Sequence, residues 1–298
     1  MRFGLVTPVV TCHPDHHSPW EEQGGPAEIV RIAVAADRLG YHHLTCSEHV
    51  AIPTAVAPVR GSRYYDPLAT LAFVAAHTTR VRLVTHVLVL PYHHPLALAK
   101  RYGTLDRLSA GRLVLGVGVG SLEEEFAVLA ADFTGRGTRY EDALRALRAA
   151  FGRREPSYAG SHYRFDGMVV DPCGVQQHVP IWLGGRSPRS LRRALLLADG
   201  WDPFRFTLAE LENLLPRARE WPAWRTRSTP FELVLTPERP PDPTVTAERR
   251  MLADSIERHR AVGATVLNLR FQNRSLEHYL EQLDAFAMLV APHFAHDA

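Results

Sequence analysis

The stretch VRLVTHVLVLPYHHPLALAKRYGTLDRLSAGRLVLGVGVGSLEEE, residues 81–125, contains the pattern that decides the fold. Residues 81–90 are almost continuously apolar and rich in β-branched side chains, as is typical of a parallel strand covered on both faces. Residues 95–108 carry apolar side chains at helical spacing, and Gly111 follows as a suitable left-handed cap. Residues 113–117 are again apolar. The stretch therefore predicts a strand, a helix and a second strand parallel to the first.

Glycines crowd the end of the second predicted strand. Gly116, Gly118 and Gly120 have no side chains, so backbone N–H groups at this point can approach a ligand closely. Ser121 comes next and is predicted to cap the following helix. The arrangement favours a planar or phosphorylated cofactor as the ligand.

The same alternation of strand and helix continues along the whole chain, which predicts βα units and a parallel sheet. The other predicted strands lie at residues 3–7, 43–47, 181–183, near Trp201, 231–235 and 265–269. Eight units predict an α/β fold of the (β/α)8 TIM-barrel type, with its chemistry at the C-terminal ends of the strands. One domain over residues 1–298 accommodates them, because such barrels routinely reach this length.

Three connections in this predicted barrel are too long for simple turns. They are residues 10–26, 50–65 and 121–179. The last is an insertion after strand four, with predicted helices at 122–131 and 140–151 and an aromatic hairpin at 158–165. Long loops on the catalytic face usually form lids or pockets, so residues 121–179 are expected to form part of the active-site wall.

Composition narrows the class of protein. The apolar fraction of 46% permits a large core, and a formal net charge of +2 lacks the basic excess of a nucleic-acid binder. No apolar run approaches the roughly 20 residues needed to cross a bilayer, and the N-terminus has no signal-peptide pattern, so a cytoplasmic protein is expected. Cys12, Cys46 and Cys173 are widely spaced without CxxC pairing, which indicates neither a disulfide framework nor structural zinc.

Four motifs occur together in a fixed order. They are the glycine-rich strand end, CSEH at 46–49, PIWLGGRSP at 180–188 and ADGW at 198–201. In these motifs the chain resembles the bacterial luciferase-like family of flavin and deazaflavin (F420) oxidoreductases. The resemblance covers residues 1 to about 205, and the remainder resembles the family only in element order. It implies a TIM barrel, a flavin or F420 cofactor and a homodimer.

The resemblance also implies roles for residues at two strand ends. It places a non-proline cis peptide between His86 and Val87, with the backbone against the cofactor ring; the alternative is a plain strand with His86 in the core. It places Glu48 and His49 near the redox centre, where an imidazole can donate a hydrogen bond or move a proton near neutral pH. A structural pair below the pocket is the alternative. The sugar-phosphate dehydrogenase branch has an acid after the third glycine, but here Ser121 stands there, so that role cannot be transferred.

Further residues are assigned to the cofactor by the same resemblance. The full predicted set is His86, Val87, Gly118, Val119, Gly120, Gly184, Gly185, Arg186 and Ser187. Residues 184–187 of this set would present N–H groups, a helix N-terminus and the fixed positive charge of Arg186 to a phosphate or side chain of the cofactor. The alternative is that the glycines serve only tight turns. Residues 123–125, three glutamates, begin the next helix and are interpreted as complementing its dipole.

The HPDHH sequence at residues 13–17 raises a metal hypothesis, because imidazoles and carboxylates are common ligands. A metal-dependent hydrolase barrel would need further ligands at strands five, six and eight, and those ends carry no histidine. No metal is therefore expected. His13 and Trp20 are predicted to border the substrate pocket. Arg270, just past strand eight, could hold an anionic group, with an ordinary surface ion pair as the alternative.

The preferred functional hypothesis is an F420-dependent oxidoreductase that transfers a hydride between the deazaflavin and a small organic substrate. In it, His49 or Glu48 supplies a proton. One alternative is an FMN-dependent monooxygenase that takes reduced flavin from a separate reductase and uses oxygen. Another is a flavin-binding protein without turnover. Neither FMN nor F420 makes an obligatory side-chain contact that the sequence reveals, so the choice between them stays open here.

Overall fold

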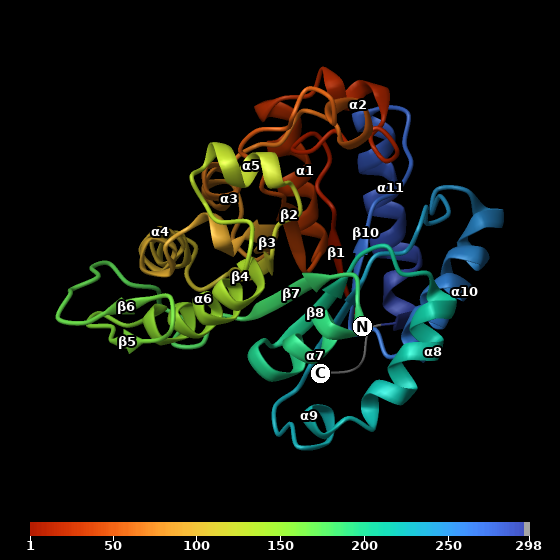
Figure 1. Cartoon of the computed structure of the whole chain (residues 1–298). Coiled ribbons are helices and arrows are strands. Elements are labelled where there is room, and N and C mark those ends of the chain that lie inside the picture. The colour runs from red at the N-terminus through yellow and green to blue at the C-terminus, as the bar shows by residue number, and fades with distance from the viewer. Residues whose placement is uncertain (295–298) are drawn as a thin grey trace.

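A computed structural model describes residues 1–294, and its centre is a closed barrel of eight parallel strands (Figure 1). Around the barrel the strands follow the order β1, β10, β9, β8, β7, β4, β3, β2. Their bounds are β1 Arg2–Leu5, β2 His43–Cys46, β3 Arg82–Val89, β4 Leu113–Gly118, β7 Ile181–Gly185, β8 Gly200–Pro203, β9 Glu232–Leu235 and β10 Val266–Leu269. The predicted TIM barrel is confirmed, with every predicted strand present.

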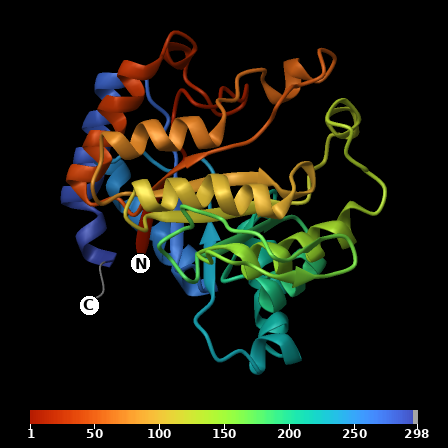
Figure 2. The same ribbon diagram turned by 90° about the vertical axis from the view of Figure 1, so that its left-hand side faces the viewer.

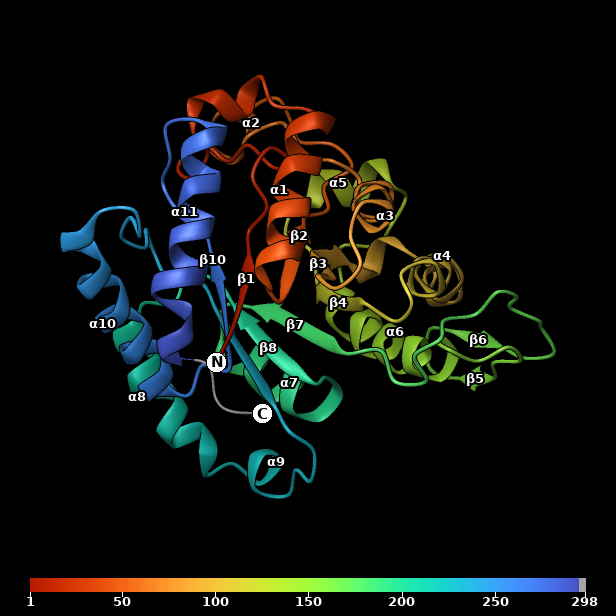
Figure 3. The same ribbon diagram turned by 180° about the vertical axis from the view of Figure 1, so that it is seen from behind.

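Helices surround the barrel. The helices between or after the strands are α1 Pro26–Leu39, α3 Pro67–Ala76, α4 Pro95–Leu108, α6 Arg136–Ala150, α7 Pro188–Leu197, α8 Leu208–Arg219, α10 Thr246–Val262 and α11 Leu276–Leu289. Several begin with proline, whose missing N–H would be unpaired in the first turn anyway. Figure 2 shows α3 (orange) and α4 (yellow) side by side, and Figure 3 shows α1 beside α11.

Shorter elements fill the connections. They are α2 Ala57–Arg60, α5 Glu123–Val128, α9 Pro222–Arg225, the 3-10 turns at Pro19–Glu22, Leu90–Tyr92 and Ala291–Phe294, and the hairpin of β5 Tyr158–Ala159 with β6 Arg164–Phe165. Within residues 1–294, no helix is long and apolar enough to cross a bilayer. Cys12, Cys46 and Cys173 are free thiols, as expected.

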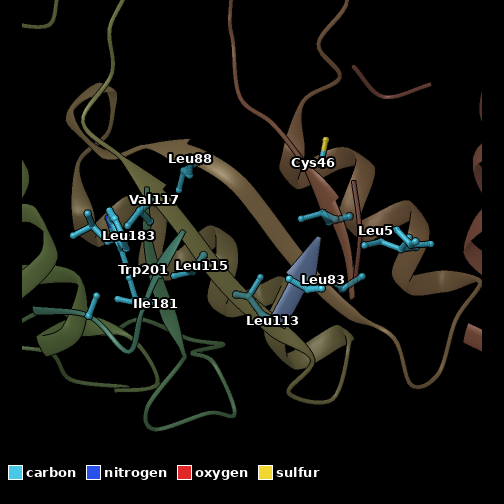
Figure 4. Close-up of a cluster of buried hydrophobic side chains, with 14 of the residues drawn as sticks. Leu5, Cys46, Leu83, Leu88, Leu113, Leu115, Val117, Ile181, Leu183 and Trp201 are labelled. Carbon is cyan, nitrogen blue, oxygen red and sulfur yellow. The ribbon is translucent and has the colours of Figure 1, made fainter. Parts of the chain in front are cut away.

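The core has two layers, because successive residues of a strand point to opposite faces. Leu83 and Leu113 belong to a large cluster shared with the surrounding helices, part of which Figure 4 shows. Their neighbours Val84 and Val114 belong to a second cluster, inside the barrel, completed by Trp182, Val234 and Val266. Full burial of each such side chain is worth about 1.5–3 kcal/mol, so the barrel is a packed core rather than a pore.

A bulge in β3 carries the predicted cis peptide. The peptide bond between His86 and Val87 is cis, and the register of β3 against β4 shifts directly after Thr85. Ser47 Oγ donates a hydrogen bond of 2.6 Å to the His86 carbonyl, which fixes the bulge from β2. A Cβ on Gly116 would lie 1.9 Å from the Thr85 carbonyl oxygen, so only glycine fits opposite the bulge.

The segment after β4 contains the two predicted helices and the predicted hairpin, in the predicted order. α5 precedes α6, the barrel helix, and the hairpin of β5 and β6 then packs on the outer side of α6, away from α2 and α5 (Figure 1). Asp142 of α6 holds this hairpin, since its Oδ1 accepts from the Tyr158 hydroxyl at 2.6 Å and its Oδ2 accepts from two N–H groups of the hairpin turn. The prediction that residues 121–179 form part of the active-site wall stays a prediction.

Candidate active site

Most of the predicted site residues gather where β2, β3, β4 and β7 end. Val87 is the centre of this group. A Cβ on Gly118 would lie 2.7 Å from Val87 Cγ2, and a Cβ on Gly184 would lie 3.2 Å from Val87 Cγ1. The two glycines, from β4 and β7, therefore make room for the side chain that the cis peptide presents. Their predicted contact with a cofactor stays a prediction.

Glu48, directly after β2, is buried and uses both carboxylate oxygens. Its Oε1 lies 2.7 Å from Nε2 of His93, and its Oε2 accepts a 2.6 Å hydrogen bond from the Val89 N–H. These contacts tie the end of β2 to the end of β3. The geometry fits the structural alternative for Glu48 better than the catalytic role predicted for it.

His49 has a different environment. Its Nδ1 lies 2.8 Å from Oε2 of Glu125, and its ring packs edge-on against Tyr64 at a centroid distance of 4.5 Å. Its side chain is 17% exposed, so the ring keeps an accessible edge. Glu125 comes from α5, so a helix in the loop after β4 positions a residue that follows β2.

Glu125 is buried, yet four donors surround it, among them the Ala51 N–H at 3.3 Å from Oε1. Besides His49, its Oε1 accepts from the Val50 N–H at 2.5 Å and its Oε2 accepts from the Tyr92 hydroxyl at 2.9 Å. Burial raises the pKa of Glu125, but these hydrogen bonds and the His49 charge outweigh it and hold the pKa below its usual value. Burial and the Glu125 carboxylate raise the pKa of Tyr92 above its usual range, so Tyr92 remains a donor. We call His49, Glu125 and Tyr92 the proton cluster.

The structure of α5 corrects two interpretations from the sequence, that of its three glutamates and that of Ser121. The three glutamates of α5 were assigned to the helix dipole, but Glu125 is buried against His49 while Glu123 and Glu124 are exposed. The sequence offered one signal for the burial of Glu125, its position directly before the apolar residue Phe126, which α5 also buries. Ser121 does not cap α5, because the helix has no side-chain cap.

The residues predicted to meet a phosphate lie at the end of β7 and the start of α7. Ser187 caps α7, with its Oγ accepting from the Ser190 N–H at 3.3 Å, and a Cβ on Gly185 would lie 2.3 Å from Ser190 Cβ. Arg186 is exposed and forms no ion pair with any residue from 1 to 294. Its unpaired charge beside a helix N-terminus suits an anionic group.

Gly120 has a structural reason to be glycine. Its φ is +78°, and a Cβ there would lie 2.6 Å from the Phe126 ring and 2.8 Å from Val89 Cγ1. The alternative given above, that the glycine serves a tight turn, therefore accounts for Gly120. A contact between the cofactor and the backbone of Val119 and Gly120 stays a prediction.

Arg270 is already paired. Its Nη2 lies 2.7 Å from Oε2 of Glu21, which is fully buried, and its Nε donates to the His16 carbonyl at 2.9 Å. The expected alternative was a surface ion pair, but the structure gives a buried one that holds the loop after β1. The prediction that Arg270 binds an anionic substrate group is not supported by this geometry.

The rest of the HPDHH loop lies beside the mouth of the barrel. Trp20 donates from Nε1 to Asn273 Oδ1, and His13 Nδ1 is 3.9 Å from Asp15 Oδ2. Between residues 1 and 294, no group of three or more His, Cys, Asp or Glu side chains could hold a metal ion. Contact of His13 and Trp20 with a substrate stays a prediction.

One pair crosses the barrel interior and was missed from sequence. His86 Nε2 lies 2.9 Å from Oδ2 of Asp202, a buried residue of β8. Burial lowers the pKa of His86, but the Asp202 charge outweighs it and leaves the pKa above its usual value. The sequence assigned His86 through its backbone alone, and no spacing in it relates β3 to β8.

A cavity of about 310 Å³ lies at the opposite, amino end of the barrel. Its lining includes Arg2, His42, Arg82, Trp182 and Glu232. Burial, together with the charges of Arg2 and Arg82, lowers the pKa of His42 to about 3. The residues of the candidate site are absent from this lining, so the two regions are distinct.

The barrel and the cis peptide in its bulge are as the family resemblance predicts. The family model for luciferase-like monooxygenases matches residues 1–292, so the chain belongs to this family of oxidoreductase enzymes. The first curated relatives, uncharacterized proteins of Mycobacterium, are 32% identical over 189 residues, and the match spans 59% of this chain and 66% of theirs, just under two thirds.

Relatives with a stated activity use two kinds of cofactor. An F420-dependent glucose-6-phosphate dehydrogenase of Intrasporangium calvum is 30% identical over 60% of this chain and 54% of its own. The crystal structure of monooxygenase RslO1 from Streptomyces bottropensis has a TM-score of 0.79 and 24% identity, covering 99% of this chain and 100% of that one. A type II Baeyer–Villiger monooxygenase of Pseudomonas putida, in complex with FMN, has a TM-score of 0.74 and 16% identity, covering 98% of both chains. These two structures show a shared fold.

Proposed function

We propose that this protein is an F420-dependent oxidoreductase that transfers a hydride between the deazaflavin and a small organic substrate. The observation that carries the proposal is the proton cluster, which sets an accessible imidazole on a buried carboxylate at the end of β2. The named F420-dependent relative supports the choice of cofactor. The acid that this branch carries after its third glycine is replaced by Ser121 here, so the role of Glu125 is argued only from its contact with His49.

The residues present fit a phosphorylated ring cofactor. Arg186 and the N-terminus of α7 would hold its phosphate, because Arg186 forms no ion pair in the described chain and lies beside the positive end of the helix dipole. The bulge at His86–Val87, with Gly118 and Gly184 beside it, would support the ring. When bound, F420 supplies two-electron hydride chemistry that protein side chains lack.

The chain itself would manage the proton. Glu125 accepts at Nδ1 of His49, so the neutral imidazole carries its proton on Nδ1 and leaves Nε2 as a base. When His49 is protonated, Nε2–H becomes an acid on the edge of the ring opposite Glu125. Tyr92 and the Val50 N–H keep Glu125 charged and oriented through both transfers. Glu48 holds the ends of β2 and β3 together.

A second candidate is an FMN-dependent monooxygenase that receives reduced flavin from a separate reductase. The likeness to RslO1 favours it, because that monooxygenase aligns with nearly the whole chain. A flavin-binding protein without turnover is the third reading, and the proton cluster argues against it, since ligand binding alone does not require a buried carboxylate on an accessible imidazole. The family resemblance further supports a homodimer, which light scattering across a dilution series would test.

Titration of the purified protein with F420 and with FMN, each followed by absorbance and fluorescence, tests the proposal. F420 should bind tightly and FMN negligibly. An Arg186→Met variant should weaken binding of the preferred cofactor, whereas Arg192→Met, an exposed arginine one turn into α7, serves as the matched control. Tight FMN binding with no F420 binding would move the assignment to the monooxygenase, and binding of neither would defeat the proposal.

A further inference from the structure

The ion pair of His86 and Asp202 spans the inside of the barrel. β3 and β8 are not neighbours, because β4 and β7 lie between them. At this level the intervening strands carry glycines: Gly184 of β7 is the register partner of Asp202, and Gly116 of β4 lies opposite the bulge. A Cβ on Gly116 would meet the Thr85 carbonyl and a Cβ on Gly184 would meet Val87 Cγ1, so the two glycines accommodate the bulge that sets His86 beside Asp202. The pair is therefore built into the barrel rather than an accident of surface side chains.

The two partners differ in exposure. The Asp202 side chain is 2% exposed, and its Oδ2 accepts no hydrogen bond within the described residues; its contact with His86 Nε2 at 2.9 Å is an ion pair without hydrogen-bond geometry. The His86 side chain is 23% exposed, so the ring borders the open end of the barrel. Within residues 1–294, no group hydrogen-bonds to His86 Nδ1. Because Nε2 lies 2.9 Å from Asp202 Oδ2, Nδ1 is the nitrogen left for a ligand.

The charges around the His86 ring also favour an anionic ligand at Nδ1. Besides Asp202, the titratable group that faces the His86 ring is His43 of β2. Burial holds the pKa of His43 well below its usual value, so His43 stays uncharged, while β4 and β7 present glycines. The Asp202 charge, acting against the burial of the ring, leaves the pKa of His86 raised. The doubly protonated ring then has an N–H at both nitrogens.

We propose that His86 is an oxyanion-binding residue on the floor of the site, with Nδ1–H as the donor and Asp202, which lies 2.9 Å from Nε2, as the positioning residue. The ligand chemistry is a delocalised oxyanion, carried either by the pyrimidine edge of the reduced cofactor or by the substrate. The cofactor source rests on the proposed function. No bond is made or broken at His86 in this role.

The first test needs no cofactor. Histidine side-chain NMR titrations of the wild type, His86→Gln and Asp202→Asn should identify the His86 resonance by its loss in the first variant. In Asp202→Asn, the pKa of His86 should fall, because burial then acts without the opposing charge. His178→Gln is the matched control, since His178 also faces an aspartate, Asp199 at 2.7 Å, but is exposed and far from the site. A pKa of His86 unchanged by Asp202→Asn would overturn the proposal.

The second test separates the two sources. Reduced and oxidised F420 and FMN are titrated into each variant, and benzoate, a carboxylate probe, is titrated into the cofactor-free protein. A charge-assisted hydrogen bond predicts a loss of about tenfold to a hundredfold in His86→Gln. Loss confined to the reduced cofactor assigns the oxyanion to the ring, and loss of benzoate binding assigns it to the substrate side. Unchanged affinity for all of these ligands would overturn the proposal. Failure of wild type to bind either cofactor would defeat the proposed function, and the benzoate and NMR results would still decide the role of His86.

Discussion

The carboxylate of Glu125 lies 2.8 Å from Nδ1 of His49, although 76 positions separate the two residues in the chain. The contact joins α5, in the loop after β4, to the residue that follows β2. Because Glu125 is also held by Val50 N–H and Tyr92, it fixes the orientation and tautomer of the imidazole. We therefore expect Glu125 and the helix that holds it to affect proton transfer as much as His49 itself does.

Replacing Glu125 by Gln should lower kcat by about a hundredfold, at the lower end of the 10²–10⁴ range for acid–base catalysis, because a neutral amide holds His49 without stabilising its charged form. Cofactor affinity should change little. Steady-state kinetics beside cofactor titration measures both quantities. Glu124→Gln, the exposed neighbour in the same helix, should behave as wild type. Equal activity of the two variants would remove Glu125 from the mechanism.

Replacing His49 by Ala should lower turnover more than cofactor affinity. If proton donation contributes about 10²–10⁴-fold, turnover should fall by that order and one limb of the pH–rate profile should change. The double variant with Glu125→Gln should be little worse than His49→Ala alone, because the two residues act as a unit. A variant with weakened cofactor binding and a wild-type rate at saturation would show that His49 only packs beside the ring.

Sequence reasoning reached the barrel, the bulge at His86–Val87 and the glycine-lined strand ends, because these are local patterns of strand, turn and glycine. It missed the partners of the predicted residues. Glu125 and Asp202 meet His49 and His86 only after the barrel closes, and nothing in sequence spacing measures that approach. Arg270 was placed correctly after its strand, but its partner Glu21 lies in a loop whose path the sequence does not determine.

Comparison with Gly40 separates two effects of a substitution at Gly120, backbone strain and crowding of the added Cβ. Both have a φ of +78°, but an added Cβ meets Phe126 and Val89 at Gly120 and nothing within 4 Å at Gly40. Each change to Ala should cost about 1–2 kcal/mol of unfolding free energy from the left-handed backbone alone. Gly120→Ala should lose more in urea denaturation and should also lower kcat, because α5 and Glu125 must shift. Equal losses for the two variants would show that crowding at Gly120 is unimportant.

His42 should make the barrel acid-sensitive from its amino end. Its pKa is about 3 in the folded chain, because of burial and then the charges of Arg2 and Arg82, against about 6.5 when unfolded. Below pH 6.5 the unfolded chain binds a proton that the folded chain refuses, so stability is full above pH 6.5 and falls as the pH drops towards 3, by up to about 1.4 kcal/mol per pH unit. His42→Asn, which can keep a polar contact with His43, should flatten this fall in urea midpoints measured between pH 7.5 and 4. The exposed His162→Asn is the control and should follow wild type. A His42→Asn curve as steep as wild type would show that other groups cause the acid loss.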